Sequence, residues 1–149
     1  MKFILKKFNE LSVDELFEIY RLRVSVFVVE QRCPYQEVDD FDKSSLHLCA
    51  WEDAKLMAYL RILPKATAFD EVSLGRVISV NRHRGLGTLL VQEGIKAARE
   101  QLGAASIVIE AQTYARGLYE KQGFVQVSDE FLEDGIPHIK MRLPLSSLN

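Results

Sequence analysis

The residues best placed to do chemistry form a cationic junction, RHRGLGTLL, at positions 82–90. Three cationic side chains stand directly before two glycines and a run of leucines. A helix that begins after the first glycine leaves its first backbone N–H groups unpaired and carries about half a positive charge at that end. Glycines have no Cβ, so a phosphate can approach these amides closely. The junction therefore predicts an anion site without identifying the anion. Its cationic residues are Arg82, His83 and Arg84, its glycines are Gly85 and Gly87, and the helix begins at Leu86.

Two nucleotide-binding motifs compete for this junction. The third glycine of a dinucleotide fingerprint would fall at Leu90, and several predicted strands precede the junction, whereas a dinucleotide-binding fold opens with its fingerprint strand. Glu110 ends the next predicted strand, where a ribose-binding acid would stand. The dinucleotide interpretation is therefore weakened but stays open. No Gly-Lys-Ser or Gly-Lys-Thr follows the glycines, which excludes a Walker A loop.

The elements that position the junction follow from periodicity and turn signals. Ser12 and Glu15 form a capping box, which predicts a helix from residue 13 to about residue 28. The runs at 46–53 and 55–63 favour an antiparallel hairpin, and a third strand run ends just before the junction. The helix that follows is expected to end at Gly103.

The second half of the chain alternates strand and helix signals. Residues 106–111 form a buried-strand pattern, 114–122 a short helix, and 124–127 and 138–143 two final strands. The predicted order, counting a first strand at the start of the chain, is strand, helix, three strands, helix, strand, helix and two strands. This order predicts a mixed α/β domain.

Bulk properties limit the range of functions. The chain has 149 residues, of which 48% are hydrophobic, so we expect one domain over 1–149. A net charge of -2, spread along the chain, gives no sign of nucleic-acid or membrane binding. Neither a signal peptide nor a spanning run is evident, so a cytoplasmic protein is expected. Cys33 and Cys49 are expected to be reduced thiols, with no disulfide and no metal site.

Two motifs together resemble one enzyme family. RHRGLG resembles the acyl-CoA pyrophosphate loop of the GNAT N-acetyltransferases, and ARGLYEKQGF, at 115–124, resembles that family's later helix. The segments at 26–48 and 131–139 further resemble the ElaA-like subgroup of these enzymes. Two positions depart from the pattern: Asp40 stands where the subgroup often has Gly, and Gln112 where many GNAT members have Asn.

The resemblance implies a fold and a co-substrate. The fold would be a single-domain GNAT fold of mixed α/β (α+β) class, with a mostly antiparallel sheet, flanking helices and a cleft where the fourth and fifth strands splay. Acetyl-CoA would be the acyl donor, with its pyrophosphate held mainly by backbone N–H groups of Arg82, His83, Arg84, Gly85, Leu86, Gly87 and Thr88. Main-chain groups of Ile78 and Val80 would hold the pantetheine arm and polarise the thioester carbonyl. Gln112 would contact the cofactor arm.

The implied reaction is direct transfer of an acetyl group from acetyl-CoA to an amine in a ternary complex, without a metal. The acceptor, a small molecule or a peptide, is not identified by the sequence, and a homodimer is compatible with it. A non-catalytic acyl-CoA-binding or regulatory domain is the alternative from another functional class. Within the enzyme class, Cys33 as an acyl-carrying nucleophile is the rival, although no base lies near it in the sequence.

Tyr119 is the residue that the resemblance assigns as general acid, because a phenol beside the sulfur can protonate the departing thiolate. The base is not singled out by spacing: His47, His138, Glu37 and Glu110 all have side chains of a suitable type. Among these, His138 and Glu110 are the residues expected near the cleft, as a base or as substrate contacts.

Residues 30–42 form the most acidic segment of the chain. A cluster of carboxylates could attract a cationic amine acceptor, since clustered charge raises the local concentration of counter-ions. The sequence nevertheless favours an exposed, solvated loop for this segment.

Overall fold

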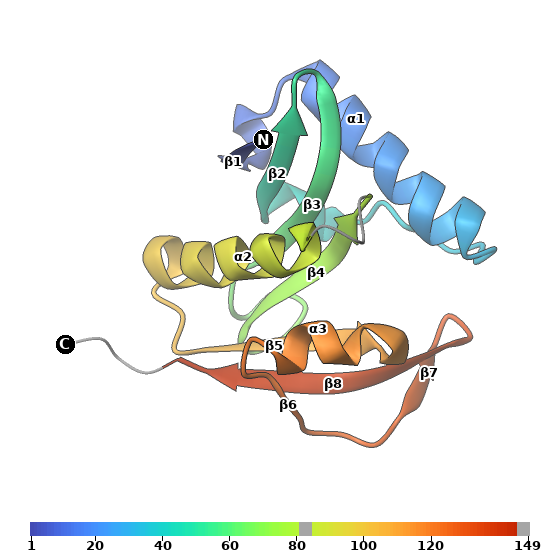
Figure 1. The fold of residues 1–149 in the computed structure, drawn as a ribbon, viewed down its shortest axis with the longest axis vertical. Helices are drawn as coiled ribbons and strands as arrows, with labels where there is room; N and C mark the ends of the chain where they lie inside the picture. Colours follow the sequence, from blue (N-terminus) through green and yellow to red (C-terminus); the bar gives the residue numbers. More distant parts are fainter. Residues whose placement is uncertain (81–84, 146–149) are drawn as a thin grey trace.

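The computed structural model describes residues 1–80 and 85–145 of the chain (Figure 1). The helices are α1 (Val13–Val24), α2 (Leu86–Leu102) and α3 (Arg116–Glu120). The strands are β1 (Lys2–Lys7), β2 (Leu46–Glu52), β3 (Lys55–Leu63), β4 (Val72–Ser79), β5 (Ser106–Gln112), β6 (Val125–Gln126), β7 (Phe131–Glu133) and β8 (Ile136–Pro144). None of the described helices is long and apolar enough to cross a membrane.

One mixed sheet organises these elements. Its strands run in the order β1-β2-β3-β4-β5-β8-β6, and β7 pairs with β8. The pairings are antiparallel except between β4 and β5, which are parallel. The predicted fold class and the predicted β2–β3 hairpin are therefore confirmed.

The β4–β5 pairing is the break in this sheet. Only Val72 and Ser73 of β4 pair with β5, and beyond them the two strands separate. The register between β3 and β4 also shifts between Tyr59 and Arg61, beside Arg76, whose φ of 53° lies in the left-handed region. An irregularity of this kind in an antiparallel pair bends the strand. The bend and the short pairing leave an opening in the middle of the sheet.

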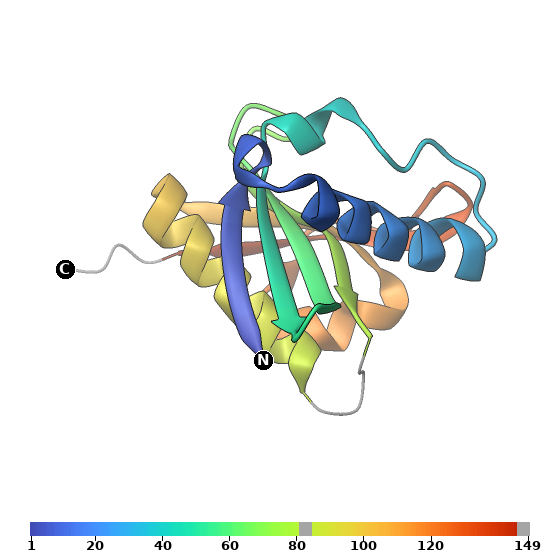
Figure 2. The ribbon, with the colours of Figure 1, turned by 90° about the horizontal axis from the view of Figure 1, so that it is seen from above.

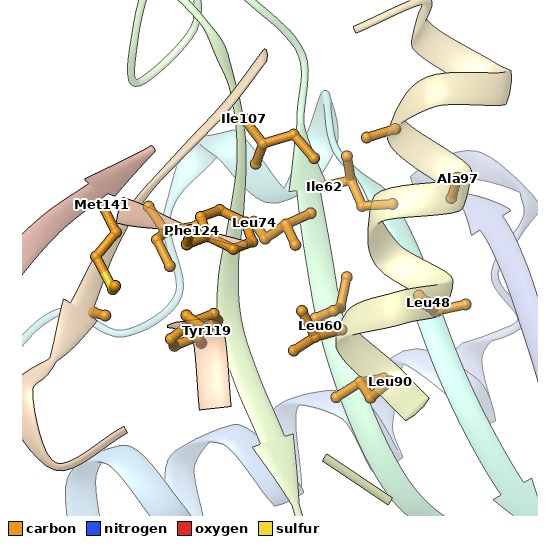
Figure 3. Close-up of a cluster of buried hydrophobic side chains, with 14 of the residues drawn as sticks. Leu48, Leu60, Ile62, Leu74, Leu90, Ala97, Ile107, Tyr119, Phe124 and Met141 are labelled. Atoms are coloured by element: carbon orange, nitrogen blue, oxygen red, sulfur yellow. The ribbon is translucent and has the colours of Figure 1, made fainter. Parts of the chain in front are cut away.

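The two faces of the sheet are covered by different helices (Figures 1 and 2). Leu60 and Ile62 of β3 point to the α2 side and pack with Leu90 in a large apolar cluster (Figure 3). Tyr59, which points to the opposite face, packs with Ile19 of α1 in a second, smaller cluster. Alternation of side chains along a strand thus divides the interior into two layers.

The helix ends follow the predicted signals closely. The Glu15 N–H donates to Ser12 Oγ (3.0 Å) and the Ser12 N–H to Glu15 Oε1 (2.8 Å), which completes the capping box before α1. Gly103, with a φ of 59°, ends α2 as expected. After α1 the chain continues as a π-helical segment, Ser25–Glu30, two residues beyond the predicted end.

Candidate active site

A cavity of about 350 Å³ occupies the opening between β4 and β5. Residues 73–77 of β4 form one side and residues 109–112 of β5 the other. The segment 31–41 closes a third side, the β7–β8 hairpin a fourth, and Tyr119 of α3 reaches it as well. The strands β4 and β5, which were expected to flank the cleft, therefore both line this cavity, whereas Ile78, Val80 and the described junction residues 85–88 do not.

The described part of the predicted anion site is the N-terminus of α2. Gly85 has a φ of 71° and stands at the N-cap, and the Leu89 N–H donates to Gly85 O (3.1 Å). The amides of Leu86, Gly87 and Thr88 precede the first intrahelical bond, so the helix supplies no acceptor for them. Among the described residues, a Cβ on Gly85 would meet no atom within 4 Å. Arg82, His83 and Arg84 lie outside the described residues.

This helix start adjoins the end of β4 and α3. A Cβ on Gly87 would lie 3.8 Å from the Cβ of Ser79 and 3.8 Å from the Leu118 side chain. The Ser79 hydroxyl oxygen is buried and has no hydrogen-bond partner among the described residues. A buried hydroxyl without a partner is unfavourable by itself, so a polar ligand group at this place would stabilise it.

The main chain of β4 corrects one prediction. The Val80 N–H, expected to serve the thioester, donates instead to Met57 O of β3 (3.0 Å). Ile78 pairs with Tyr59 in the same register, so its main-chain groups also face β3. Because successive residues of a strand direct these groups to opposite sides, Val77 and Ser79 present theirs to the β5 side. The prediction is therefore displaced by one residue along the strand.

Tyr119 lies at the base of the cavity. Tyr119 is 6% exposed. Its ring packs edge-on against the Phe124 ring, with the two ring centroids 5.7 Å apart (Figure 3). Burial raises the pKa of its hydroxyl well above the ordinary value for tyrosine, and the nearby Tyr114 raises it further. The hydroxyl therefore keeps its proton throughout the neutral and mildly alkaline range.

Glu110 and His138 are brought together on the β5–β8 wall. His138 pairs with Gln112 in the register, two residues along β5 from Glu110, and both candidates line the cavity. Glu133 of β7 joins them, with its Oε2 3.5 Å from His138 Nε2. Burial raises the pKa of Glu110, and the carboxyl group of Glu133, within hydrogen-bonding reach, raises it further.

The other two base candidates serve the structure. His47 is completely buried, with Nδ1 2.6 Å from the Tyr59 hydroxyl and Nε2 2.8 Å from Asp42 O. Burial lowers the pKa of His47, because it disfavours the charged ring. The Glu37 carboxylate accepts from Arg23 Nε (3.0 Å to each oxygen). Neither side chain is placed to take a proton from a substrate in the cavity.

Three arginines and three carboxylates form a largely buried assembly that we term the arginine network. It comprises Arg23, Arg61, Arg76, Glu37, Asp39 and Asp42. Asp42 accepts from Arg23 Nη1 (2.7 Å) and Arg61 Nη1 (2.9 Å). Burial acts to raise the pKa of Asp39, but the hydrogen bonds with Arg61 and the positive charges of Arg61, Arg76 and Arg23 together outweigh this and hold the pKa below its ordinary value.

The arginine network overturns the expectation of a solvated acidic loop. Glu37 and Asp42 are 3% and 1% exposed, and their charges are paired with arginines from α1, β3 and β4. The segment 31–43 is consequently fixed as a wall of the cavity. Its sequence carried a signal that was missed, because Arg61 interrupts an apolar strand run and so had to find a partner inside.

Gln112 has a partner across the cavity. Its side-chain amide exchanges two hydrogen bonds with Gln31, at 3.1 and 3.2 Å, although 81 residues separate them. Gln31 follows the π-helical segment, so this pair joins the third side of the cavity directly to the end of β5. A ligand that used the Gln112 amide would have to replace Gln31.

Sequence reasoning also missed the β7–β8 hairpin, which contributes Glu133 and Asp134 to the cavity. Its turn places Asp134 and Gly135 at φ of 52° and 76°. Asp-Gly is a strong signal for such a two-residue turn, and it is present in the sequence. Among the described residues, no group of three or more His, Cys, Asp and Glu side chains is arranged to hold a metal ion.

Comparisons with known proteins agree with this geometry. Residues 11–145 match the family model of the GNAT acetyltransferase domain. A UPF0039 protein of Schizosaccharomyces pombe is 41% identical over 149 residues, covering 97% of this chain and 98% of the relative. ElaA of Escherichia coli is 36% identical over 137 residues, covering 89% of this chain and 90% of ElaA.

Solved structures give the same result. The crystal structure of an acyl-CoA N-acyltransferase from Pseudomonas aeruginosa is similar with a TM-score of 0.88 and 41% identity, over 95% of this chain and 99% of that one. The crystal structure of E. coli ElaA has a TM-score of 0.87 with 34% identity, over 95% and 99%. The chain therefore belongs to the GNAT acetyltransferase family and, within it, to the ElaA-like proteins.

Proposed function

We propose that this protein transfers the acetyl group of acetyl-CoA directly to an amine acceptor in a ternary complex, and that residues 1–149 act as one GNAT domain. The observation that carries the proposal is the cavity between β4 and β5, which adjoins elements that suit both the donor and the acceptor. When bound, acetyl-CoA supplies a thioester whose C–S bond breaks as the new C–N bond forms.

Donor binding would use main-chain groups. The amides of Leu86, Gly87 and Thr88, for which the helix supplies no acceptor, would hold the pyrophosphate, and Gly85 has no Cβ to hinder its approach. Arg82, His83 and Arg84 would add positive charge to this site. The main-chain groups of Val77 and Ser79, which face away from β3, would hold the pantetheine arm and polarise the carbonyl. These main-chain groups suit acetyl-CoA because the strand fixes their positions before acetyl-CoA binds.

Tyr119 would protonate the departing thiolate. A Cys-like thiol has a pKa of about 8.5 and an ordinary phenol one of about 10, so this transfer needs close geometry rather than a strong acid. Burial raises the pKa of Tyr119, which keeps the proton available on the hydroxyl. Low polarity destabilises the departing thiolate and the phenolate alike, so burial gives this transfer no net driving force, and close placement of the hydroxyl at the sulfur has to favour it.

Glu110 and His138 would receive the proton of the acceptor amine. They lie together on the β5–β8 wall of the cavity, and the raised pKa of Glu110 brings its carboxylate closer to the basicity that this task requires. His47 and Glu37 are left out of this role because the arginine network and its surroundings bind them.

A calorimetric titration with acetyl-CoA, and in parallel with NAD, tests the donor site. Gly85→Asp would place a carboxylate in front of the α2 amides, whereas Gly103→Asp would place one at the opposite end of the same helix. Both glycines have left-handed φ angles and open space at the Cβ, so the backbone strain of the two variants is matched. We expect acetyl-CoA to bind the wild type and Gly103→Asp, and to be lost from Gly85→Asp.

Two outcomes would contradict the proposal. Saturable binding of NAD without acetyl-CoA binding would return the junction to the dinucleotide interpretation. Equal acetyl-CoA affinity in the two aspartate variants would mean that the α2 N-terminus does not hold the pyrophosphate.

A further inference from the structure

Three acceptor groups converge on one corner of the cavity. The Glu110 carboxyl comes from β5, that of Glu133 from β7, and the imidazole of His138 from β8. The register explains the convergence, because His138 stands opposite Gln112 on one side and Phe131 on the other. Residues two apart on a strand share a face, so Glu110 and Glu133 are brought to the same side of the sheet as His138.

The hydrogen bonding of His138 determines what its other nitrogen offers. Nδ1 lies 2.7 Å from Ile136 O, and a carbonyl oxygen only accepts, so Nδ1 carries the proton. In the neutral ring the Nε2 atom then carries a lone pair and no proton. This atom lies 3.5 Å from Glu133 Oε2. Both of these atoms accept hydrogen bonds, and the residue is 7% exposed. With a neutral imidazole, the pair therefore lacks a donor between its members.

Glu110 and Glu133 repeat this mismatch. Both carboxyl groups line the cavity, and Glu133 adds to the effect of burial in raising the pKa of Glu110, because two negative charges repel. A single donor group with several N–H bonds would satisfy Glu110, Glu133 and His138 together. An ammonium group has three such bonds and a positive charge. Phe131, whose ring stacks on His138 with centroids 6.1 Å apart, adds an apolar surface for an attached alkyl chain.

The charges around this corner leave a negative excess. Asp134 follows Glu133 in the hairpin turn and also lines the cavity. Lys140 of β8 stands opposite Glu110 in the register, and its Nζ lies 5.8 Å from the centre of the Phe69 ring. The arginines on the far wall, Arg61 and Arg76, are held by the carboxylates of the arginine network. Among the described residues, a carboxylate brought in by a substrate would therefore meet three carboxylates in the lining of this corner, whereas Lys140 does not line the cavity.

We propose that Glu110, Glu133 and His138 form an ammonium-receiving site, so that the acceptor is an alkylamine that carries no carboxylate next to its amino group. This inference rests on the proposed function for its catalytic meaning, but the site itself can be tested by binding alone. The acceptor enters as an ammonium ion, gives one proton to Glu110 or His138, and then attacks as the neutral amine. Amino acids that react through the α-amino group are excluded by their adjacent carboxylate.

Butylamine and norvaline make a matched pair of probes, because norvaline is butylamine with a carboxylate on the carbon that bears nitrogen. Calorimetric titration of each into the protein with CoA present measures acceptor binding without turnover. We expect norvaline to bind at least about tenfold more weakly than butylamine, since an unpaired carboxylate near like charges loses about 1.4 kcal/mol or more. Rates of CoA release from acetyl-CoA should follow the same order.

Glu133→Gln and Glu130→Gln are the matched variants. Both remove one carboxylate from the same part of the chain, but Glu130 is exposed and does not line the cavity. Glu133 is 45% exposed at its side chain, so its substitution should leave the fold intact. We expect Glu133→Gln to weaken butylamine binding about tenfold, as charge-assisted hydrogen bonds do when one partner loses its charge. Glu130→Gln should bind butylamine as the wild type does.

The outcomes separate this inference from the proposed function. Equal binding of norvaline and butylamine, or unchanged butylamine binding in Glu133→Gln, would overturn the ammonium site even if acetyl-CoA is turned over. Amine binding that is lost in Glu133→Gln, in a protein that never releases CoA, would support the site and contradict the catalytic proposal.

Discussion

The two faces of the sheet hold the molecule together by different means. On the α2 face, Leu60, Ile62 and Leu90 are packed in an apolar cluster, all of them fully buried (Figure 3). On the α1 face, the arginine network occupies much of the interior, with Arg23 fully buried. Apolar contacts are non-directional and tolerate small shifts, whereas ion pairs need each partner in place. The first face therefore supports the frame of the cavity, and the second fixes its irregular wall.

The largest effect that separates the faces is expected from Asp42→Ala. The change leaves Arg23 and Arg61 buried with fewer partners, and removing one member of a buried ion pair typically lowers the free energy of unfolding by about 3–5 kcal/mol. Asp40→Ala removes the neighbouring exposed carboxylate and should change stability by less than about 0.5 kcal/mol. Urea denaturation of the three proteins measures both values. A small and equal effect in both variants would mean that the network does not hold this wall.

Tyr119 is a candidate general acid that belongs to the apolar cluster on the α2 face, and the variant Tyr119→Phe tests this role. The ring and its contact with Phe124 remain, so acetyl-CoA binding and the melting temperature should hardly change. Loss of a general acid should lower turnover about a hundredfold or more. Because the pKa of Tyr119 is raised, wild-type turnover should not fall in the mildly alkaline range through ionisation of this residue.

The control for this variant is Tyr114→Phe. Tyr114 also lines the cavity but is 71% exposed, so its hydroxyl is solvated and should be dispensable. Steady-state CoA release measures both variants. If Tyr119→Phe retained full turnover, water or another group would supply the proton to the thiolate. The α2 face would then contribute no catalytic side chain. A protein with acetyl-CoA binding and no turnover with any amine would favour the non-catalytic alternative.

The contrast between the faces also explains what could be predicted from the sequence. The frame was predictable because its signals are local: the capping box before α1, the glycine after α2 and the alternation in β2 and β3. The arginine network was not, because Arg23 and Asp42 lie 19 residues apart and composition reports a charge without its partner. An acidic run was therefore interpreted as a solvated loop.

The candidate site shows the same contrast between residues that local sequence signals predict and residues that depend on contacts with other strands. Glu110, His138 and Tyr119 were predicted as cavity residues, the first two by strand position and the third by resemblance, and all three line the cavity. Val80 was assigned one residue out of register, since the hydrogen-bonding side of a strand depends on its partner strand. Glu133 was missed because the short β7 strand has little alternation to reveal it.

Gly94→Ala should disturb the apolar face by a smaller amount. A Cβ at this position would lie 2.9 Å from Leu60 Cδ2, so α2 can approach β3 this closely only with glycine there. The contact is with the end of a side chain, which can move, and alanine favours the helix, so we expect a net loss of about 1 kcal/mol. Gly117→Ala in α3 meets nothing within 4 Å and should be neutral or slightly stabilising. Thermal denaturation of both variants measures the difference, and equal stabilities would indicate that α2 shifts freely on the sheet.

The smallest effect is expected at Cys33, on the wall that the arginine network fixes. Its thiol lies in the cavity lining and donates to Asp134 O (3.3 Å), so it could be suspected of carrying the acyl group. Direct transfer predicts that Cys33→Ala turns over acetyl-CoA at the wild-type rate, with only a weak hydrogen bond lost. Mass spectrometry of the wild type after mixing with acetyl-CoA should then find no acetylated thiol. A rapid first release of CoA that disappears in Cys33→Ala would instead establish a covalent intermediate. Cys33 would then be a catalytic nucleophile and not only a residue of the cavity wall.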